Sequence, residues 1–455
     1  MTEQNSLPNK WAQQSPSLLA LSTPEADYTW RQLKEKIDRV VASLIAQGIQ
    51  KNDVLTCVGK NSPELLFTYL ACLEIGAICA LTMPQTEREL KLKLDALYAD
   101  PNDRKLWLAQ SYESLNTYVT INDSDAHSSI SKHDYDESNL ASIIFTSGSM
   151  GAPKAVAHTS KQHLASASGL LQQFHFKQGD TWLLSLPMYH VSGLSIIYRW
   201  LYAGATLKIG TGNLLDDING VSHASLVATQ LKRLIECDQP LALTHVLLGG
   251  SHIPLELSQR AAEQGIETWL GYGMTEAAST VTAKPIDQHY SAGKVLPNRQ
   301  VMLKGQRIYI GGETLASGYY CKGTLMPLRE GGWFDSKDLG EWVEGELKII
   351  GRADNLFISG GENIHCEEIE AELNKHPEII QSVVVPIADV EFGHRPVAVI
   401  QTRIDLTQSE IESTLGGLTR FKWPDAYYSM PEALLADGIK VPRSRVKQWL
   451  ETKLS

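Results

Sequence analysis

Short apolar runs that suit β-strands alternate with segments of helical periodicity over the first two thirds of the chain. The predicted strands cover residues 53–59, 77–83, 141–147, 181–187, 205–210, 224–229, 245–250 and 267–273. Residues 31–48 place Leu33, Ile37 and Leu44 on one helical face, and residues 64–76 are apolar enough for a buried helix. Continuous apolar strands alternating with helices predict an α/β fold with layered, largely parallel sheets.

The pattern changes twice towards the C-terminus. From about residue 285, short strand-like runs separated by glycines (VMLKG, RIYIGG, WVEGELKIIG) predict a small antiparallel, β-barrel-like subdomain. Beyond Gly351, a helix over 364–377 and strands over 381–389 and 395–403 are expected. We therefore predict a large N-terminal domain over 1–351 and a small, mobile α+β domain over 352–455.

Composition narrows the class of protein. A chain of 455 residues with 43% hydrophobic and 20% charged residues is typical of a globular protein with two or more domains. A net charge of −11 without a basic block argues against nucleic acid as a partner. The six cysteines form no C-x-x-C pair, which argues against zinc and dithiol redox sites. No apolar run reaches ~18–20 residues, so we expect a cytoplasmic protein without a membrane span.

The stretch IIFTSGSMGAPKAVAHT (143–159) combines glycines, hydroxyl residues and one lysine directly after an apolar run. Backbone N–H groups of such a loop can converge on an anion. A Walker loop is disfavoured, because Pro153 offers no N–H and Ala155 offers no hydroxyl for Mg²⁺. The residues alone leave an ordinary strand-to-loop turn open. The candidate phosphate contacts are Thr146, Ser147, Gly148, Ser149, Gly151 and Lys154.

TSGSMGAPK is similar to the [ST]-S-G-[ST]-T-G-x-P-K loop of the adenylate-forming superfamily, which includes acyl- and aryl-CoA synthetases, adenylation domains and luciferase. In that superfamily the loop closes over the phosphates of ATP. Met150 stands where the family usually has threonine, which removes one potential phosphate donor.

A second motif, GYGMTE (271–276), resembles the family's Y-G-x-T-E. The resemblance implies that Gly271, Tyr272 and Gly273 lie against adenine and that Thr275 contacts phosphate. It also implies that Glu276 holds Mg²⁺ through a hard carboxylate oxygen. Without the family, an ordinary turn at the end of a strand would be the favoured explanation of these residues.

WFDSKDLGE (333–341) and GRADNLFISGGENIHCEEIE (351–370) resemble two further family segments. Asp338 falls where the family's carboxylate accepts both ribose hydroxyls, although Lys337 replaces a glycine there. Arg352 is expected to add to ribose or phosphate binding.

The same C-terminal resemblance indicates which residues form the hinge, contact CoA and supply the catalytic lysine. Asp354 falls at the family's hinge, and Gly360 and Gly361 would admit the pantetheine arm of coenzyme A close to the backbone. Lys440, in DGIKVPRS (437–444), matches the catalytic lysine that stabilises charge during adenylation. Together the motifs imply ATP, Mg²⁺ and CoA, and two half-reactions separated by a rotation of the small domain.

The acid pocket is marked by LPMYHVSGLSIIYRWLYAGATLKI (186–209), in which His190 could gate the acid site. Arg199 is a charge in an apolar stretch, so it needs either a structural partner or a substrate carboxylate. This stretch and HASLVATQL (223–231) look like those of bacterial o-succinylbenzoate–CoA ligases of menaquinone biosynthesis, whose substrate is an aromatic dicarboxylate. The remaining substrate-binding candidates are Ser225, Gly249, Gly250 and Ser251.

Several alternatives stay open on sequence alone. They are another aryl- or acyl-CoA ligase, a stand-alone enzyme that loads a carrier protein, and a phosphate-binding protein without chemistry. The last is disfavoured because it would need neither Lys440 nor a hinge. The sequence is compatible with a homo-oligomer but does not fix the oligomeric state.

Overall fold

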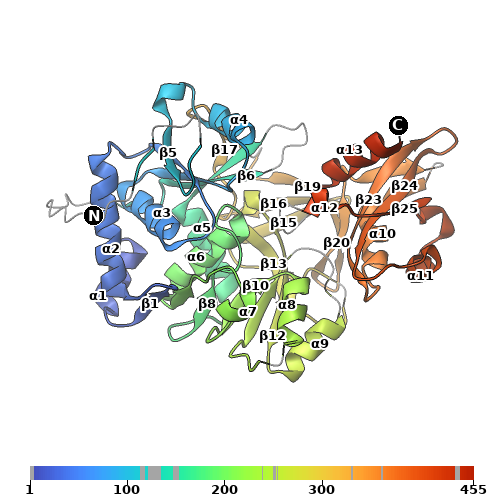
Figure 1. Ribbon diagram of the computed structural model, residues 1–455, viewed down its shortest axis with the longest axis horizontal. Coiled ribbons are helices and arrows are strands. Elements are labelled where there is room, and N and C mark those ends of the chain that lie inside the picture. Colours follow the sequence, from blue (N-terminus) through green and yellow to red (C-terminus); the bar gives the residue numbers. More distant parts are fainter. Residues whose placement is uncertain are drawn as a thin grey trace.

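The computed structural model describes the chain except residues 1–4, 113–117, 121–134, 147–152, 238, 250–252, 254, 290, 329–330, 360–361, 436–440 and 455. Two large sheets with helices packed on them form the N-terminal part, and a smaller unit of helices and strands ends the chain (Figure 1). The predicted α/β class is confirmed. Among the described helices, none is both long and apolar enough to cross a membrane.

The nine-stranded sheet is parallel at its centre and antiparallel at both ends. Its strands, in spatial order, are β14 (Lys294–Val295), β13 (Ser279–Pro285), β12 (Glu267–Met274), β11 (His245–Leu248), β10 (His223–Leu226), β8 (Thr181–Leu183), β9 (Thr206–Lys208), β1 (Leu19–Ser22) and β2 (Asp27–Thr29). The helices associated with it include α7 (Leu214–Asp217), α8 (Ala228–Ile235) and α9 (Leu255–Glu263).

The seven-stranded sheet is parallel from β5 to β6 and antiparallel beyond. Its strands, in spatial order, are β18 (Thr324–Pro327), β17 (Gly318–Cys321), β7 (Lys154–Thr159), β6 (Leu140–Thr146), β4 (Ile78–Thr82), β3 (Val54–Val58) and β5 (Lys105–Leu108). Helix α4 (Glu87–Leu97) packs Leu97 into the cluster on one face of this sheet, and helix α5 (Ser160–Leu171) follows β7.

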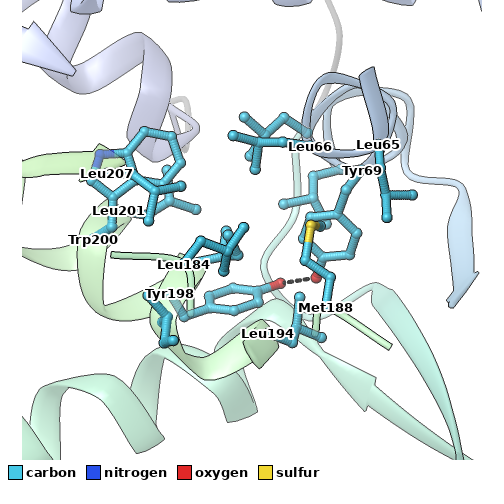
Figure 2. Close-up of a cluster of buried hydrophobic side chains, with 14 of the residues drawn as sticks. Leu65, Leu66, Tyr69, Leu184, Met188, Leu194, Tyr198, Trp200, Leu201 and Leu207 are labelled. Carbon is cyan, nitrogen blue, oxygen red and sulfur yellow. Dashed lines mark hydrogen bonds between the residues drawn. The ribbon is translucent and has the colours of Figure 1, made fainter. Parts of the chain in front are cut away.

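The main core lies between helices α3 (Pro63–Ile75) and α6 (Val191–Ala203) and includes α2 (Trp30–Ala46). Figure 2 shows Tyr69 of α3 and Tyr198 of α6 pointing toward one another, with their hydroxyls 2.8 Å apart. The boundaries of α3 are set locally, because Ser62 caps its N-terminus, Pro63 occupies the first turn, and Gly76 takes a left-handed φ of 76° at its end. Helix α1 (Leu7–Gln14) packs beside these helices.

A four-stranded antiparallel sheet follows, as predicted for the glycine-punctuated region. Its order is β15 (Arg299–Lys304), β16 (Arg307–Gly312), β19 (Phe334–Val343) and β20 (Glu346–Arg352). Backbone hydrogen bonds between the Ala292–Gly293 segment and Leu347 connect β20 with the chain that leads into β14. The four strands therefore curl against the edge of the nine-stranded sheet.

The C-terminal unit contains the hairpin β21 (Leu356–Ser359)–β22 (Glu362–His365) and the sheet β23 (Ile379–Asp389), β24 (Gly393–Thr402) and β25 (Ala426–Ser429). Its helices are α10 (Cys366–Leu373), α11 (Gln408–Ser413), α12 (Glu432–Leu435) and α13 (Arg443–Leu454). Two clusters of buried hydrophobic residues contain only residues from Phe357 onward. The domain boundary between 351 and 352 stays a prediction.

Most predicted elements differ from the observed ones by a few residues at their ends, and three of these differences are informative. The strand expected over 224–229 ends at Leu226, because Gln230 reaches back to the backbone N–H of Val227 and starts α8. The strand expected over 181–187 ends at Leu183. The helix expected over 364–377 starts only at Cys366, because Ile364 pairs with Phe357 in the β21–β22 hairpin.

Candidate active site

The phosphate-loop candidates lie where two antiparallel strands of the seven-stranded sheet end. Thr146 closes β6, Lys154 opens β7, and the two residues are partners in the strand register. The ammonium of Lys154 lies 5.2 Å from the ring centroid of Tyr319 on β17. Ser147, Gly148, Ser149 and Gly151 lie outside the described residues, as does Met150.

The second motif forms the end of β12 and a single 3-10 turn, Thr275–Ala277. A Cβ on Gly273 would lie 1.9 Å from the carbonyl oxygen of Ser279, and one on Gly271 would lie 2.8 Å from Thr280 Cγ2. These glycines therefore allow the close approach of β13, a constraint additional to the adenine contact expected from sequence. Between them, Tyr272 donates a hydrogen bond of 2.6 Å to Asp338.

Asp338 and Arg352 are register partners on β19 and β20, and Arg352 Nη1 lies 3.3 Å from Asp338 Oδ1. Burial raises the pKa of the Asp338 carboxyl, while the hydrogen bond from Tyr272 and the charge of Arg352 oppose that rise. Arg352 Nε also donates to Asp354 Oδ1 at 2.9 Å. The structure thus brings together the predicted adenine, ribose and hinge residues Tyr272, Asp338, Arg352 and Asp354.

Lys337, which stands in place of the family's glycine, has a φ of 62°. This is the left-handed region that glycine adopts without strain. Its carbonyl accepts a hydrogen bond of 2.8 Å from the N–H of Ala353, so this strained residue within β19 supports the segment between Arg352 and Asp354. A lysine in this conformation costs about 1 kcal/mol relative to glycine.

Glu276 is the carboxylate on the turn after β12, and its Oε1 accepts a hydrogen bond of 3.2 Å from the hydroxyl of Tyr319. The described residues contain no group of three or more His, Cys, Asp or Glu side chains arranged to hold a metal. Mg²⁺ commonly binds through one or two carboxylates together with phosphate oxygens and water. A single carboxylate in this position fits that mode of binding.

His190 is the N-cap residue of α6, and its side chain makes no capping hydrogen bond. Burial lowers the pKa of its imidazole, and the nearby charge of Lys93 lowers it further. Lys93, on α4, donates a hydrogen bond of 2.6 Å to Thr82 Oγ1 at the end of β4. His190 is therefore held neutral beside the carboxyl ends of the seven-stranded sheet.

Arg199 lies on α6 and is only 2% exposed. Its guanidinium stacks 5.2 Å from the ring centroid of Trp182 and donates a hydrogen bond of 3.3 Å to Thr280 Oγ1. Burial lowers the pKa of this guanidinium, and the charge of Arg299 adds to the effect. No ion pair connects Arg199 to a carboxylate in the described part of the chain, which argues against the structural salt bridge considered from sequence.

Ser225 lies on the same face of the nine-stranded sheet as Trp182. Trp182 and His223 are register partners, and side chains alternate along β10, so Ser225 points to the face that His223 shares with Trp182. The Ser225 hydroxyl is buried and has no hydrogen-bond partner among the described residues. A buried hydroxyl without a partner, on the sheet face of the ring that Arg199 covers, and a buried guanidinium without a carboxylate among the described residues are suited to receive an anionic group.

A family model for AMP-binding enzymes matches residues 8–320. The chain belongs to the AMP-binding enzyme family. It is 39% identical over 445 residues to the 2-succinylbenzoate–CoA ligase of Salmonella typhimurium, covering 97% of this chain and 96% of that protein. The predicted resemblance is confirmed.

Solved structures of AMP-binding enzymes agree with this assignment. An arginine-to-lysine variant of Escherichia coli MenE with bound OSB-AMS is 36% identical, with a TM-score of 0.90 and coverage of 99% of both chains. The o-succinylbenzoate coenzyme A synthetase (MenE) of Bacillus subtilis, in complex with ATP and magnesium ion, is 25% identical, with a TM-score of 0.78. It covers 94% of this chain and 96% of that chain.

Of the remaining predicted site residues of this AMP-binding enzyme, one has a described position. Gly249 lies at the end of β11, where its N–H donates to the carbonyl of Leu226 at 3.2 Å. Gly250 and Ser251 directly after it lie outside the described residues, as do Gly360, Gly361 and Lys440. Their roles in substrate, CoA and transition-state binding remain predictions.

Sequence reasoning missed Tyr319 and Lys93, both of which contact predicted site residues or lie close to them. Tyr319 lies 43 positions from Glu276 in the sequence and belongs to a hairpin whose sheet partners could not be inferred locally. Lys93 is one of two lysines on the amphipathic helix α4. Its contacts with Thr82, at a strand end, and with the ring of Phe145 distinguish it, and both contacts depend on the fold.

Proposed function

We propose that this AMP-binding enzyme is an ATP-dependent 2-succinylbenzoate–CoA ligase that yields 2-succinylbenzoyl-CoA, AMP and pyrophosphate in menaquinone biosynthesis. The observation that supports the choice of acid is the buried Arg199, which has no carboxylate partner among the described residues and covers the ring of Trp182, on whose sheet face the Ser225 hydroxyl is also left without a described partner. A substrate with a second carboxylate supplies the missing partner, whereas simple benzoic or fatty acids do not. The relatives named above support the same acid.

In the first half-reaction, an oxygen of the succinyl carboxylate attacks the α-phosphorus of ATP. The new O–P bond forms as the bond to the β-phosphate oxygen breaks, and pyrophosphate leaves. Thr146, Lys154 and Thr275 are proposed to hold phosphate oxygens, and Lys440 to stabilise the charge at the α-phosphate. Asp338 accepts the ribose hydroxyls while Tyr272 and Arg352 fix its position. Magnesium, held by Glu276, would neutralise phosphate charge when bound.

In the second half-reaction, the sulfur of CoA attacks the acyl carbonyl carbon. The new C–S bond replaces the C–O bond to AMP, AMP leaves, and the thiol proton passes to solvent. We propose that rotation about Asp354 removes Lys440 and brings Gly360 and Gly361 to the entering thiol. The neutral His190 admits the acyl group and the thiol without adding a charge to the site.

The decisive test is pyrophosphate release with a panel of acids, followed by mass spectrometry of the thioester. We expect release with 2-succinylbenzoate and formation of its CoA thioester, and weak release with benzoate, succinate and a fatty acid. Equal or faster release with benzoate would contradict the assignment of the acid. Release of pyrophosphate without a CoA thioester would favour the alternative, an adenylation enzyme that loads a carrier protein. A cytoplasmic location without a nucleic-acid partner is part of the same proposal.

A further inference from the structure

Tyr319 belongs to a hairpin that leaves one sheet to join another. After β16 the chain departs from the four-stranded sheet, forms β17 and β18 beside β7, and then returns as β19. Tyr319 is the register partner of Val156, two residues beyond Lys154. Side chains two residues apart on a strand share a face, so Lys154 lies on the same face of β7 as Val156. The ring of Tyr319 can therefore approach the ammonium of Lys154.

The segment that leads into the hairpin is joined to β7 and to the backbone of the residue that carries the proposed metal carboxylate. The N–H of Ala316 donates to the carbonyl of Glu276 at 2.9 Å, and the N–H of Ser317 donates to Ala157 on β7, also at 2.9 Å. The backbone just before Tyr319 is therefore fixed to β7 and to the turn that carries Glu276.

The side chain of Tyr319 then makes the two contacts that bear on chemistry. Its hydroxyl donates 3.2 Å to Glu276 Oε1, and its half-buried ring lies 5.2 Å from the ammonium of Lys154. A carboxylate that accepts one hydrogen bond on one oxygen keeps its other oxygen for a cation. A lysine over an aromatic face loses part of the rotamer freedom that would otherwise oppose phosphate binding.

We propose that Tyr319 is a positioning residue for nucleotide binding, which orients Glu276 toward the metal ion of Mg·ATP and holds Lys154 toward the phosphates. This inference rests on the proposed function, because it takes the roles of Glu276 and Lys154 from it. The hydroxyl, through Glu276, raises the affinity for ATP only when Mg²⁺ is present. The ring, through Lys154, raises the affinity for ATP with or without Mg²⁺.

The test is calorimetric titration of ATP into the full chain without any acid, once with Mg²⁺ and once with EDTA. Tyr319→Phe should weaken Mg·ATP binding about fivefold, which corresponds to the loss of one typical intramolecular hydrogen bond. It should change metal-free ATP binding less than twofold. Tyr319→Leu, which also removes the ring, should weaken metal-free binding by a further factor of about three.

The matched control is Tyr309→Phe, since the ring of Tyr309 lies 4.8 Å from the ammonium of Lys304 outside the site. It should leave both affinities within twofold of the unsubstituted chain. On a Glu276→Gln background, Tyr319→Phe should add no further loss with Mg²⁺. Thermal unfolding of each variant checks that the fold is retained.

The outcomes separate the two proposals. If Tyr319→Phe weakens both affinities equally, or neither, the positioning role is wrong. If the unsubstituted chain binds Mg·ATP but releases no pyrophosphate with 2-succinylbenzoate, the proposed function is wrong while the role in nucleotide binding stands.

Discussion

Arg199 and Thr280 are joined by a single hydrogen bond of 3.3 Å, which connects α6 to β13 inside the core. An arginine that is 2% exposed, with one hydroxyl partner and a second arginine as its charged neighbour, lacks the compensation that buried charges need. A bound anionic group would offset the cost of burying this charge. Arg199 is therefore expected to strengthen substrate binding while lowering the stability of the free protein.

Arg199→Leu should lower kcat/KM for 2-succinylbenzoate more than tenfold, which is about 1.4 kcal/mol of transition-state binding. The same change should leave the melting temperature of the free protein unchanged or higher, because it removes an uncompensated buried charge. Steady-state kinetics and calorimetric unfolding measure the two effects. A loss below tenfold would remove the support for a dicarboxylate substrate.

Asp338→Asn should raise the KM for ATP about tenfold with a smaller change in the KM for the acid. The carboxylate accepts from Tyr272 at 2.6 Å through Oδ2 and from Arg352 through Oδ1. An amide keeps one acceptor and introduces a donor that faces either the tyrosine hydroxyl or the guanidinium. Tyr272→Phe is the matched control and should cost less, since it leaves the carboxylate intact. A change confined to the KM for the acid would contradict ribose binding by Asp338.

Lys93→Met should stabilise the protein at neutral pH by about 2 kcal/mol. Burial lowers the pKa of the Lys93 ammonium from 10.5 to about 8. Below pH 8 both folded and unfolded chains carry the proton, so the cost of burying the charge is fully present. Between pH 8 and 10.5 the folded chain loses the proton first, and the cost fades as the pH rises.

Urea unfolding at pH 7 and pH 10 measures this difference. The gain from Lys93→Met should be larger at pH 7 than at pH 10. Lys91→Met, an exposed position on the same helix, is the control and should be neutral at both values. A gain that does not depend on pH would show that packing, and not charge burial, explains the effect.

Lys440→Ala should abolish pyrophosphate release while preserving thioester formation from supplied 2-succinylbenzoyl-adenylate. The reason is that a lysine at the α-phosphate stabilises charge that develops only in the adenylation step. Single-turnover assays of each half-reaction with CoA separate the two steps. Equal losses of rate in both half-reactions would contradict the proposal that Lys440 acts in the adenylation step alone.

Much of the fold could be predicted because its signals are local. The apolar runs of β3, β4 and β6 are buried strands, and the capping residues around α3 are adjacent to it in sequence. Arg199 could be singled out because a charge interrupts an apolar helix. The turn after Leu226 could not be anticipated, because the apolar pattern continues through it while a side-chain cap ends the strand.

The contacts between distant segments could not be read from the pattern. No feature of the sequence indicates the positive φ of Lys337, since lysine does not favour that conformation. The role of Tyr319 depends on which sheet accepts β17, and the sequence places that hairpin between two strands of a different sheet.

The pairing of the β17–β18 hairpin with a different sheet from its flanking strands also affects local unfolding. Strands β16 and β19 belong to one sheet, while the segment between them completes the edge of another beside β7. Neither sheet can separate from the other without breaking backbone pairs at Gly318 and Tyr319. The amides of β7 and β16 should therefore exchange with solvent hydrogen in one cooperative unit, with a shared opening free energy.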